Sequence, residues 1–217
     1  MNQEITHKRL EEYFDLIAEK TEKLPYHRHF SNDHIISDGL KIHLDIYEYH
    51  PKAPNIVFIP GTAIYSLCYA EVMYKLGQQG YNIIGLDPRG HGRSEGKRGD
   101  YTIMEIMKDV ENTIEFVSEK FNNKISLMGS SQGGIVAFYL AAKKSKVQSV
   151  ICQNFADLTS QDTTGLTRRP GLTSFLKPLM LTVSGLISEQ QIPITTYLDL
   201  EKIKVKYFGN AKRFIDI

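Results

Sequence analysis

The sequence predicts an α/β protein with a mostly parallel β-sheet and helices on both faces of that sheet. Two observations carry this prediction. Four short runs are mostly apolar rather than alternating, which is typical of strands covered on both faces, and segments of helical periodicity separate them. The four runs cover residues 55–60, 82–87, 124–129 and 147–155. Strands and helices in alternation indicate parallel strands joined by helical crossovers.

The segment before the first run predicts a helix followed by a hairpin. The helix covers residues 3–20, where apolar residues recur at helical spacing among charges. These residues are Ile5, Leu10, Phe14 and Ile17. Residues 34–51 predict two strands around a turn at Asp38 and Gly39.

Three helices are predicted between the apolar runs. The first covers about residues 68–79 and ends at Gly80, and the last covers about 132–144. The clearest covers 102–121, where Thr102 and Glu105 have the spacing of a capping box. The apolar stripe of that helix consists of Ile103, Met107, Val110, Ile114, Val117 and Phe121.

Composition and charge exclude several classes of protein. A net charge of +1 favours neither nucleic acid nor an anionic membrane surface as a partner. The start of the chain lacks the apolar segment of a signal peptide, and no later stretch is long enough to span a bilayer. Cys68 and Cys152 lack metal-ligand spacing and are predicted to be buried free thiols, which suits a reducing compartment. We therefore expect a cytoplasmic location and no metal or organic cofactor.

Residues 129–133, Gly-Ser-Ser-Gln-Gly, match the motif G-x-S-x-G around Ser131. The motif follows a predicted buried strand and opens a predicted helix, which is the context that a nucleophilic serine on a tight turn requires. The start of the helix also offers backbone N–H groups to a developing oxyanion. A phosphate-binding turn is the alternative, but the Gly-Lys-Ser/Thr ending of a nucleotide loop is absent.

Three segments in this order resemble the α/β-hydrolase family, in its monoacylglycerol lipase and lysophospholipase (serine aminopeptidase S33-type) branch. The segments are FIPGTA at 58–63, DPRGHGRSEGKRGDY at 87–101 and GSSQGG at 129–134. The resemblance implies a serine ester hydrolase that forms an acyl-enzyme with a small-molecule acyl ester. It implies Ser131 as nucleophile and the backbone N–H groups of Thr62 and Gln132 as oxyanion hole. The branch usually has His-Gly where this chain has Pro60-Gly61.

The same resemblance raises a difficulty with the general base. The family order is serine, then acid, then histidine, yet all seven histidines of this chain precede Ser131. Asp157 has a position from which some family members draw their acid. Asp87, Arg89 and His91 are expected to build a loop wall, and His91 is the weaker alternative as a base.

The resemblance also implies a division of the chain. Residues 1–157 are expected to form a partial hydrolase core, and residues 158–217 a lid or cap. Within the second region, the apolar segments 172–176 and 179–187 fit either a roof over Ser131, able to touch lipid transiently, or an ordinary core helix. The last two of eight family strands are expected to be missing.

Two hypotheses about function stay open at this point. The chain is either a fragment of a serine ester hydrolase that lacks the catalytic Asp and His, or a non-catalytic relative that binds an acyl ligand or a partner. The sequence does not indicate the oligomeric state.

Overall fold

A computed structural model describes residues 3–143 and 146–153. The strands are β1 (Ser31–Ser37), β2 (Leu40–Tyr47), β3 (Asn55–Ile59), β4 (Asn82–Leu86), β5 (Ile125–Ser130) and β6 (Val147–Gln153). The α-helices are α1 (Gln3–Thr21), α2 (Ala70–Gly77), α3 (Ile103–Lys120) and α4 (Gln132–Lys143). Two 3-10 helices, η1 (Tyr26–His29) and η2 (Ser66–Tyr69), precede β1 and α2.

The described strands form one sheet in the order β1-β2-β4-β3-β5-β6. β1 and β2 pair antiparallel, and β2 pairs antiparallel with β4. The pairs β3–β4, β3–β5 and β5–β6 are all parallel. The predicted fold class, an α/β protein with a mostly parallel sheet, is therefore confirmed. The predicted lid, residues 158–217, lies outside the described residues.

The predicted hairpin turn also lies at the predicted residues. Ser37 pairs with Leu40, so Asp38 and Gly39 form a two-residue loop. Both have positive φ, 50° and 79°. Tight hairpins favour this conformation because its twist matches that of the flanking strands.

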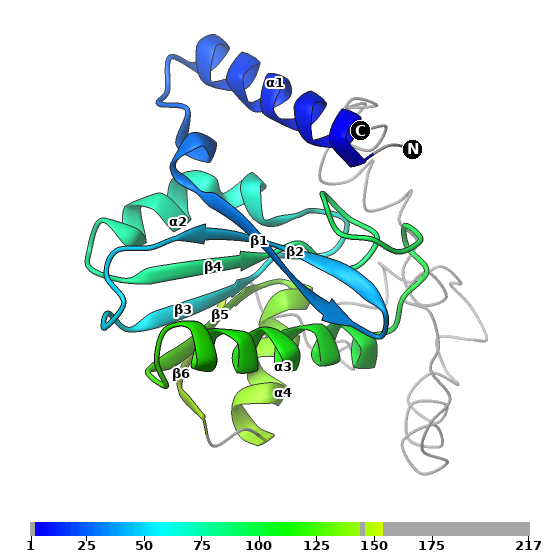
Figure 1. Cartoon of the computed structure of the whole chain (residues 1–217), viewed down its shortest axis with the longest axis vertical. Coiled ribbons are helices and arrows are strands. Elements are labelled where there is room, and N and C mark those ends of the chain that lie inside the picture. The colour runs from blue at the N-terminus through cyan, green and yellow to red at the C-terminus, as the bar shows by residue number, and fades with distance from the viewer. Residues whose placement is uncertain (1–2, 144–145, 154–217) are drawn as a thin grey trace, which may run out of the picture.

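Helices cover both faces of the sheet, with α1 and α2 on one side and α3 and α4 on the other (Figure 1). Neighbouring residues of β3 show how the faces alternate. Val57 is fully buried in the apolar cluster on the α3 and α4 side, together with Val110 of α3. Phe58 is fully buried on the opposite face, against Met73 of α2. This alternation is the period of two that a strand imposes on its side chains.

The start of α3 shows the predicted capping box. The Thr102 hydroxyl accepts a hydrogen bond from the Glu105 N–H, and the Glu105 carboxylate accepts one from the Thr102 N–H. Two backbone donors at the helix start are thereby satisfied. No helix among the described residues is long and apolar enough to cross a bilayer.

The structure corrects two expectations about burial. β6 was expected to be covered on both faces, but each of its residues is either exposed or only partly buried, and Ile151 is 51% exposed. The reason is its place at an edge of the described sheet, where it pairs only with β5. Cys68 was expected to be buried and is exposed, and Cys152 is partly buried.

Candidate active site

Ser131 occupies a tight corner between β5 and α4. Its φ is 54°, a left-handed conformation that costs free energy for a residue with a side chain. Packing around the corner leaves no room for larger neighbours. A Cβ on Gly129 would lie 2.0 Å from the Gly133 carbonyl oxygen, and a Cβ on Gly133 would lie 2.1 Å from the Ile59 carbonyl oxygen. The corner leaves the Ser131 side chain exposed.

Backbone hydrogen bonds hold this corner from both sides. The Ser131 N–H donates to the Gln153 carbonyl of β6 at 2.8 Å. The Ser131 carbonyl accepts from the N–H groups of Gly134 at 3.0 Å and Ile135 at 3.2 Å, which begins α4. Gln132 is the first residue of α4, so its N–H has no partner within the helix. Such an N–H group can bind an anion at the start of a helix.

The loop after β3 passes directly against Ser131. Ile59, the last residue of β3, pairs with Gly129 of β5, so the loops that follow these strands start side by side. A Cβ on Gly61 would lie 3.3 Å from the Ser131 Cβ. Thr62 follows in this loop. The structure thus brings Thr62, Ser131 and Gln132 together at the carboxyl ends of β3 and β5, where the strand order reverses and α/β proteins place their ligands.

A side-chain contact that the sequence did not predict joins the two loops. The Thr62 hydroxyl donates to Gln132 Oε1 at 3.1 Å, and the Tyr101 hydroxyl donates to the same oxygen at 3.4 Å. Tyr101 belongs to the segment 87–101, but no motif gave it a role.

Ser130, beside the candidate nucleophile, is buried and accepts a hydrogen bond from the Tyr69 hydroxyl at 3.2 Å. It therefore packs locally against Tyr69.

Arg89, in the loop after β4, forms ion pairs with residues of neighbouring elements. The Arg89 guanidinium is buried and donates to both oxygens of Asp109, at 2.9 Å and 2.6 Å. It also contacts Glu105 at 3.1 Å and Asp38 at 2.9 Å. One arginine thereby ties the loop to α3 and to the hairpin turn.

His91 is part of the same wall. Its side chain is 5% exposed, its Nδ1 lies 3.1 Å from the Arg89 carbonyl, and its ring contacts Tyr101 edge-on at 5.5 Å. Burial lowers the pKa of His91 to about 4, so the ring is neutral at neutral pH. Within residues 8–143 and 146–153, no hydrogen bond joins His91 or another histidine to the Ser131 hydroxyl. Asp157, the alternative acid, lies outside the described residues.

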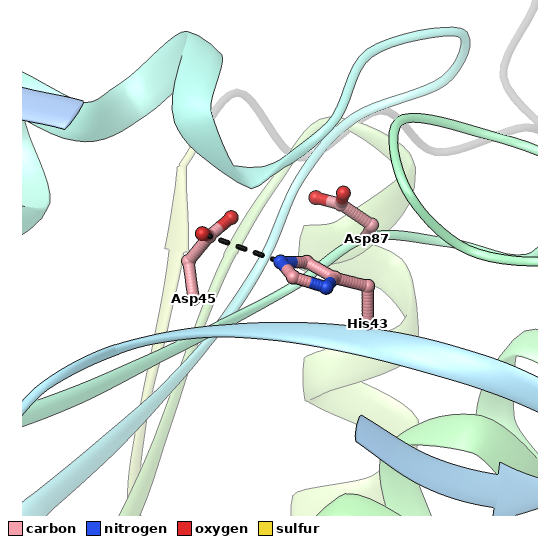
Figure 2. A group of neighbouring side chains, drawn as sticks. All are labelled: His43, Asp45 and Asp87. Atoms are coloured by element: carbon pink, nitrogen blue, oxygen red, sulfur yellow. Dashed lines mark hydrogen bonds and ion pairs between the residues drawn. The ribbon is translucent and has the colours of Figure 1, made fainter. Parts of the chain in front are cut away.

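A second polar cluster lies beneath the η2 turn. Figure 2 shows His43 and Asp45 from β2 beside Asp87, which follows β4. One ligand atom from each of the three lies within 4.8 Å of the others, which is a spacing that could suit a metal ion. However, the Arg93 guanidinium lies 2.6 Å from Asp45 Oδ1. That fixed positive charge opposes a cation, so we interpret the cluster as an internal ion network.

The Ser66 hydroxyl links the two carboxyl groups of this network. Ser66 Oγ lies 2.5 Å from Asp45 Oδ2 and 2.6 Å from Asp87 Oδ1. Backbone N–H groups of Ser66 and Arg93 donate to the two oxygens of Asp87, each at 2.9 Å. Burial raises the pKa of Asp87. Burial also acts on Asp45, but the hydrogen bond from His43 and the charge of Arg93 outweigh it and lower the pKa of Asp45.

Comparison with known proteins identifies a family to which this chain is similar. Residues 50–180, more than half of the chain, match the family model of serine aminopeptidase, S33. An uncharacterised 31.7 kDa protein of Escherichia coli, from the traX–finO intergenic region, is 29% identical over 133 residues, which cover 58% of this chain and 46% of that protein. The serine hydrolase BPHL of Homo sapiens is 31% identical over 75 residues, which cover 35% of this chain and 26% of BPHL. The chain thus spans less than half the length of these curated relatives.

A solved structure shows the same fold. The α/β hydrolase GrgF from Penicillium sp. sh18 matches with a TM-score of 0.60 and 20% identity, covering 83% of this chain and 67% of GrgF. Its likeness supports the architecture, and the family match supports descent from a common hydrolase ancestor. The chain therefore belongs to the serine aminopeptidase S33 family of hydrolases and has the α/β-hydrolase fold.

Proposed function

We propose that this chain carries the nucleophile of a serine ester hydrolase of the monoacylglycerol lipase and lysophospholipase type. The observation that supports this most is the left-handed, exposed Ser131 at the carboxyl end of β5, directly against the loop after β3. Strained backbone of this kind persists where the surrounding structure holds it, and it is frequent at catalytic positions.

The proposed reaction starts with attack of the Ser131 hydroxyl oxygen on the ester carbonyl carbon. The carbonyl oxygen becomes an oxyanion, and the N–H groups of Thr62 and Gln132 stabilise it. The positive end of the α4 dipole acts in the same direction. The hydroxyl proton passes to a general base and then to the departing alcohol, which leaves Ser131 acylated. Water releases the acid in a second step.

The general base decides how fast this chain can react. No histidine follows Ser131 in the sequence, and among the described residues none hydrogen bonds its hydroxyl. A serine site without its base keeps an acceleration on the order of 10³–10⁴-fold over water from positioning and oxyanion stabilisation. The proposal therefore predicts slow turnover by this chain and a faster reaction when imidazole is added as a diffusible base.

The proposed substrate has an apolar acyl chain. This part of the proposal depends on the resemblance of residues 58–63, 87–101 and 129–134 to the lipase branch and on the apolar segment 179–187 of the expected lid. An acyl chain gains about 25 cal/mol for each Å² of apolar surface that it buries. A longer acyl chain should therefore react with a higher kcat/KM.

Ester hydrolysis with added imidazole tests the proposal. The substrates are p-nitrophenyl acetate, butyrate and octanoate, followed by a monoacylglycerol and a lysophospholipid. We expect kcat/KM to rise about tenfold from acetate to octanoate, and Ser131→Ala to abolish turnover. Ser130→Ala is the matched control, since it removes the neighbouring hydroxyl, and it should stay within threefold of the parent. Turnover that persists in Ser131→Ala would refute the proposal.

A non-catalytic acyl-binding protein is the second candidate function. The observation that favours it is the lack of a histidine in contact with Ser131 among the described residues. The same experiment separates the two functions, because a binding protein would retain a fatty acid in equilibrium dialysis yet hydrolyse no ester at any imidazole concentration.

A further inference from the structure

We propose that the Gln132 side chain is a positioning residue, which fixes Thr62 so that the N–H groups of Thr62 and Gln132 converge on one point beside Ser131. The catalytic effect of this contact rests on the proposed function. We call the contact between the Gln132 side chain and the Thr62 hydroxyl the brace. Its effect on the loop is a structural claim, which can be tested even if the chain hydrolyses no ester.

The contacts of the carboxamide carry the argument. Its oxygen, Oε1, accepts hydrogen bonds from the Thr62 hydroxyl at 3.1 Å and from the Tyr101 hydroxyl at 3.4 Å. Gln132 is 7% exposed and Tyr101 is 2% exposed. Water therefore competes poorly for these bonds, which are stronger in a site of low dielectric. The brace joins loops that are 70 residues apart in the sequence.

The loop that the brace holds is strained. Ala63, directly after Thr62, has φ 65°, a left-handed conformation that residues with a Cβ rarely adopt. Such a residue keeps its conformation only where its surroundings determine it. Thr62 is the neighbour whose side chain is tied to α4, so the hydrogen bond to Gln132 opposes the relaxation of this loop.

The other end of the carboxamide supports a positioning role over a purely stabilising one. Gln132 Nε2 is buried and has no hydrogen-bond partner among the described residues. An unpaired buried donor lowers stability, and an apolar side chain of the same length would avoid that loss. What glutamine provides at this place is the acceptor that holds the Thr62 hydroxyl.

Four variants separate the acceptor from the donor. Gln132→Met keeps the length and removes both ends of the amide, whereas Gln132→Glu keeps an acceptor oxygen, replaces the Nε2 donor with a second oxygen and adds a negative charge when it is ionised. Thr62→Val removes the hydroxyl and keeps the backbone N–H, whereas Thr62→Ser keeps the hydroxyl. Ser149→Ala is the matched control, because it deletes a hydroxyl hydrogen bond to Ser126 on an exposed part of β6.

The first readout is the ¹⁵N order parameter of the residue 62 N–H. We expect a rigid value, about 0.85, in the parent protein, in Gln132→Glu, in Thr62→Ser and in Ser149→Ala. We expect a value below about 0.6 in Gln132→Met and in Thr62→Val. An unchanged order parameter in those two variants overturns the inference, and so does an equal loss in Gln132→Glu.

The second readout is the hydrolysis of p-nitrophenyl butyrate with added imidazole. Loss of the brace should lower kcat about tenfold and leave KM within twofold, because an oxyanion donor acts in the transition state. Combining Gln132→Met with Thr62→Val should lower kcat no further than either change alone. Absence of turnover in the parent would refute the proposed function, while the order parameter would still decide the brace.

Discussion

At the scale of single residues, the environment of a side chain decides which histidine can do chemistry. His91 lies on a loop at the carboxyl end of a strand, the edge where this fold places its chemistry. Yet, in the part of the chain that the structure describes, no hydrogen bond joins its ring to the Ser131 hydroxyl, and the ring is buried against Tyr101. Burial holds the pKa of His91 at about 4, which makes it a weak acceptor of the Ser131 proton. We therefore assign His91 to the loop wall.

The low pKa of His91 predicts a loss of stability in acid. In the unfolded chain the ring binds a proton near pH 6.5, whereas the folded protein resists protonation down to about pH 4. Stability therefore falls as the pH falls through that window. From pH 7.5 to pH 5 this histidine should cost about 2 kcal/mol of unfolding free energy.

Urea unfolding of His91→Asn at both pH values checks this prediction. Asparagine keeps a donor for the Arg89 carbonyl but does not titrate, so its pH-dependent loss should be about 2 kcal/mol smaller than that of the parent. His34→Asn replaces an exposed histidine and serves as the control. Equal acid sensitivity of the parent and His91→Asn would contradict the assignment.

At the scale of elements, the two loops at the carboxyl ends of β3 and β5 form the candidate site together. Each has one non-glycine residue in the left-handed region, Ala63 in the first and Ser131 in the second. Glycine would relieve the strain at both positions, so a side chain there raises the question of what it provides. At Ser131 it provides the proposed nucleophile, and at Ala63 the structure shows no side-chain role.

Ala63→Gly should therefore stabilise the protein. The left-handed conformation destabilises a residue with a Cβ by roughly 1–2 kcal/mol, and glycine avoids this cost. Glycine also raises the conformational entropy of the unfolded chain, which offsets part of the gain in stability. The expected gain is about 0.5–1 kcal/mol in unfolding free energy. Ala142→Gly, on the exposed side of α4, should lose about 1 kcal/mol instead. Equal losses in both variants would show that the loop is unstrained.

At the scale of the whole molecule, the sheet and its helices could be predicted because their signals are local. Apolar runs covered on both faces predicted β3, β4 and β5 within about one residue, and the capping box predicted the start of α3 at Thr102. The exposure of Ile151 in β6 was not predicted from its apolar neighbours, although the expected absence of two further strands already placed this strand at an edge of the sheet.

Only those parts of the candidate site that lie within sequence motifs could be predicted. The motif around Ser131 predicted the corner, and the structure places Thr62 and Gln132 beside it, while their catalytic roles stay predictions. The bond from Thr62 to the Gln132 side chain had no signal, because it joins two loops across the sheet. The internal network of Asp45, Ser66 and Asp87 was missed for the same reason.

Mapping of a fluorophosphonate adduct by mass spectrometry tests the central claim most directly, because the probe reports which serine attacks. We predict an adduct on Ser131 that forms slowly, forms faster with added imidazole, is absent from Ser131→Ala and persists in Ser130→Ala. An adduct on another residue, or labelling of Ser131→Ala at the rate of the parent, would contradict the account.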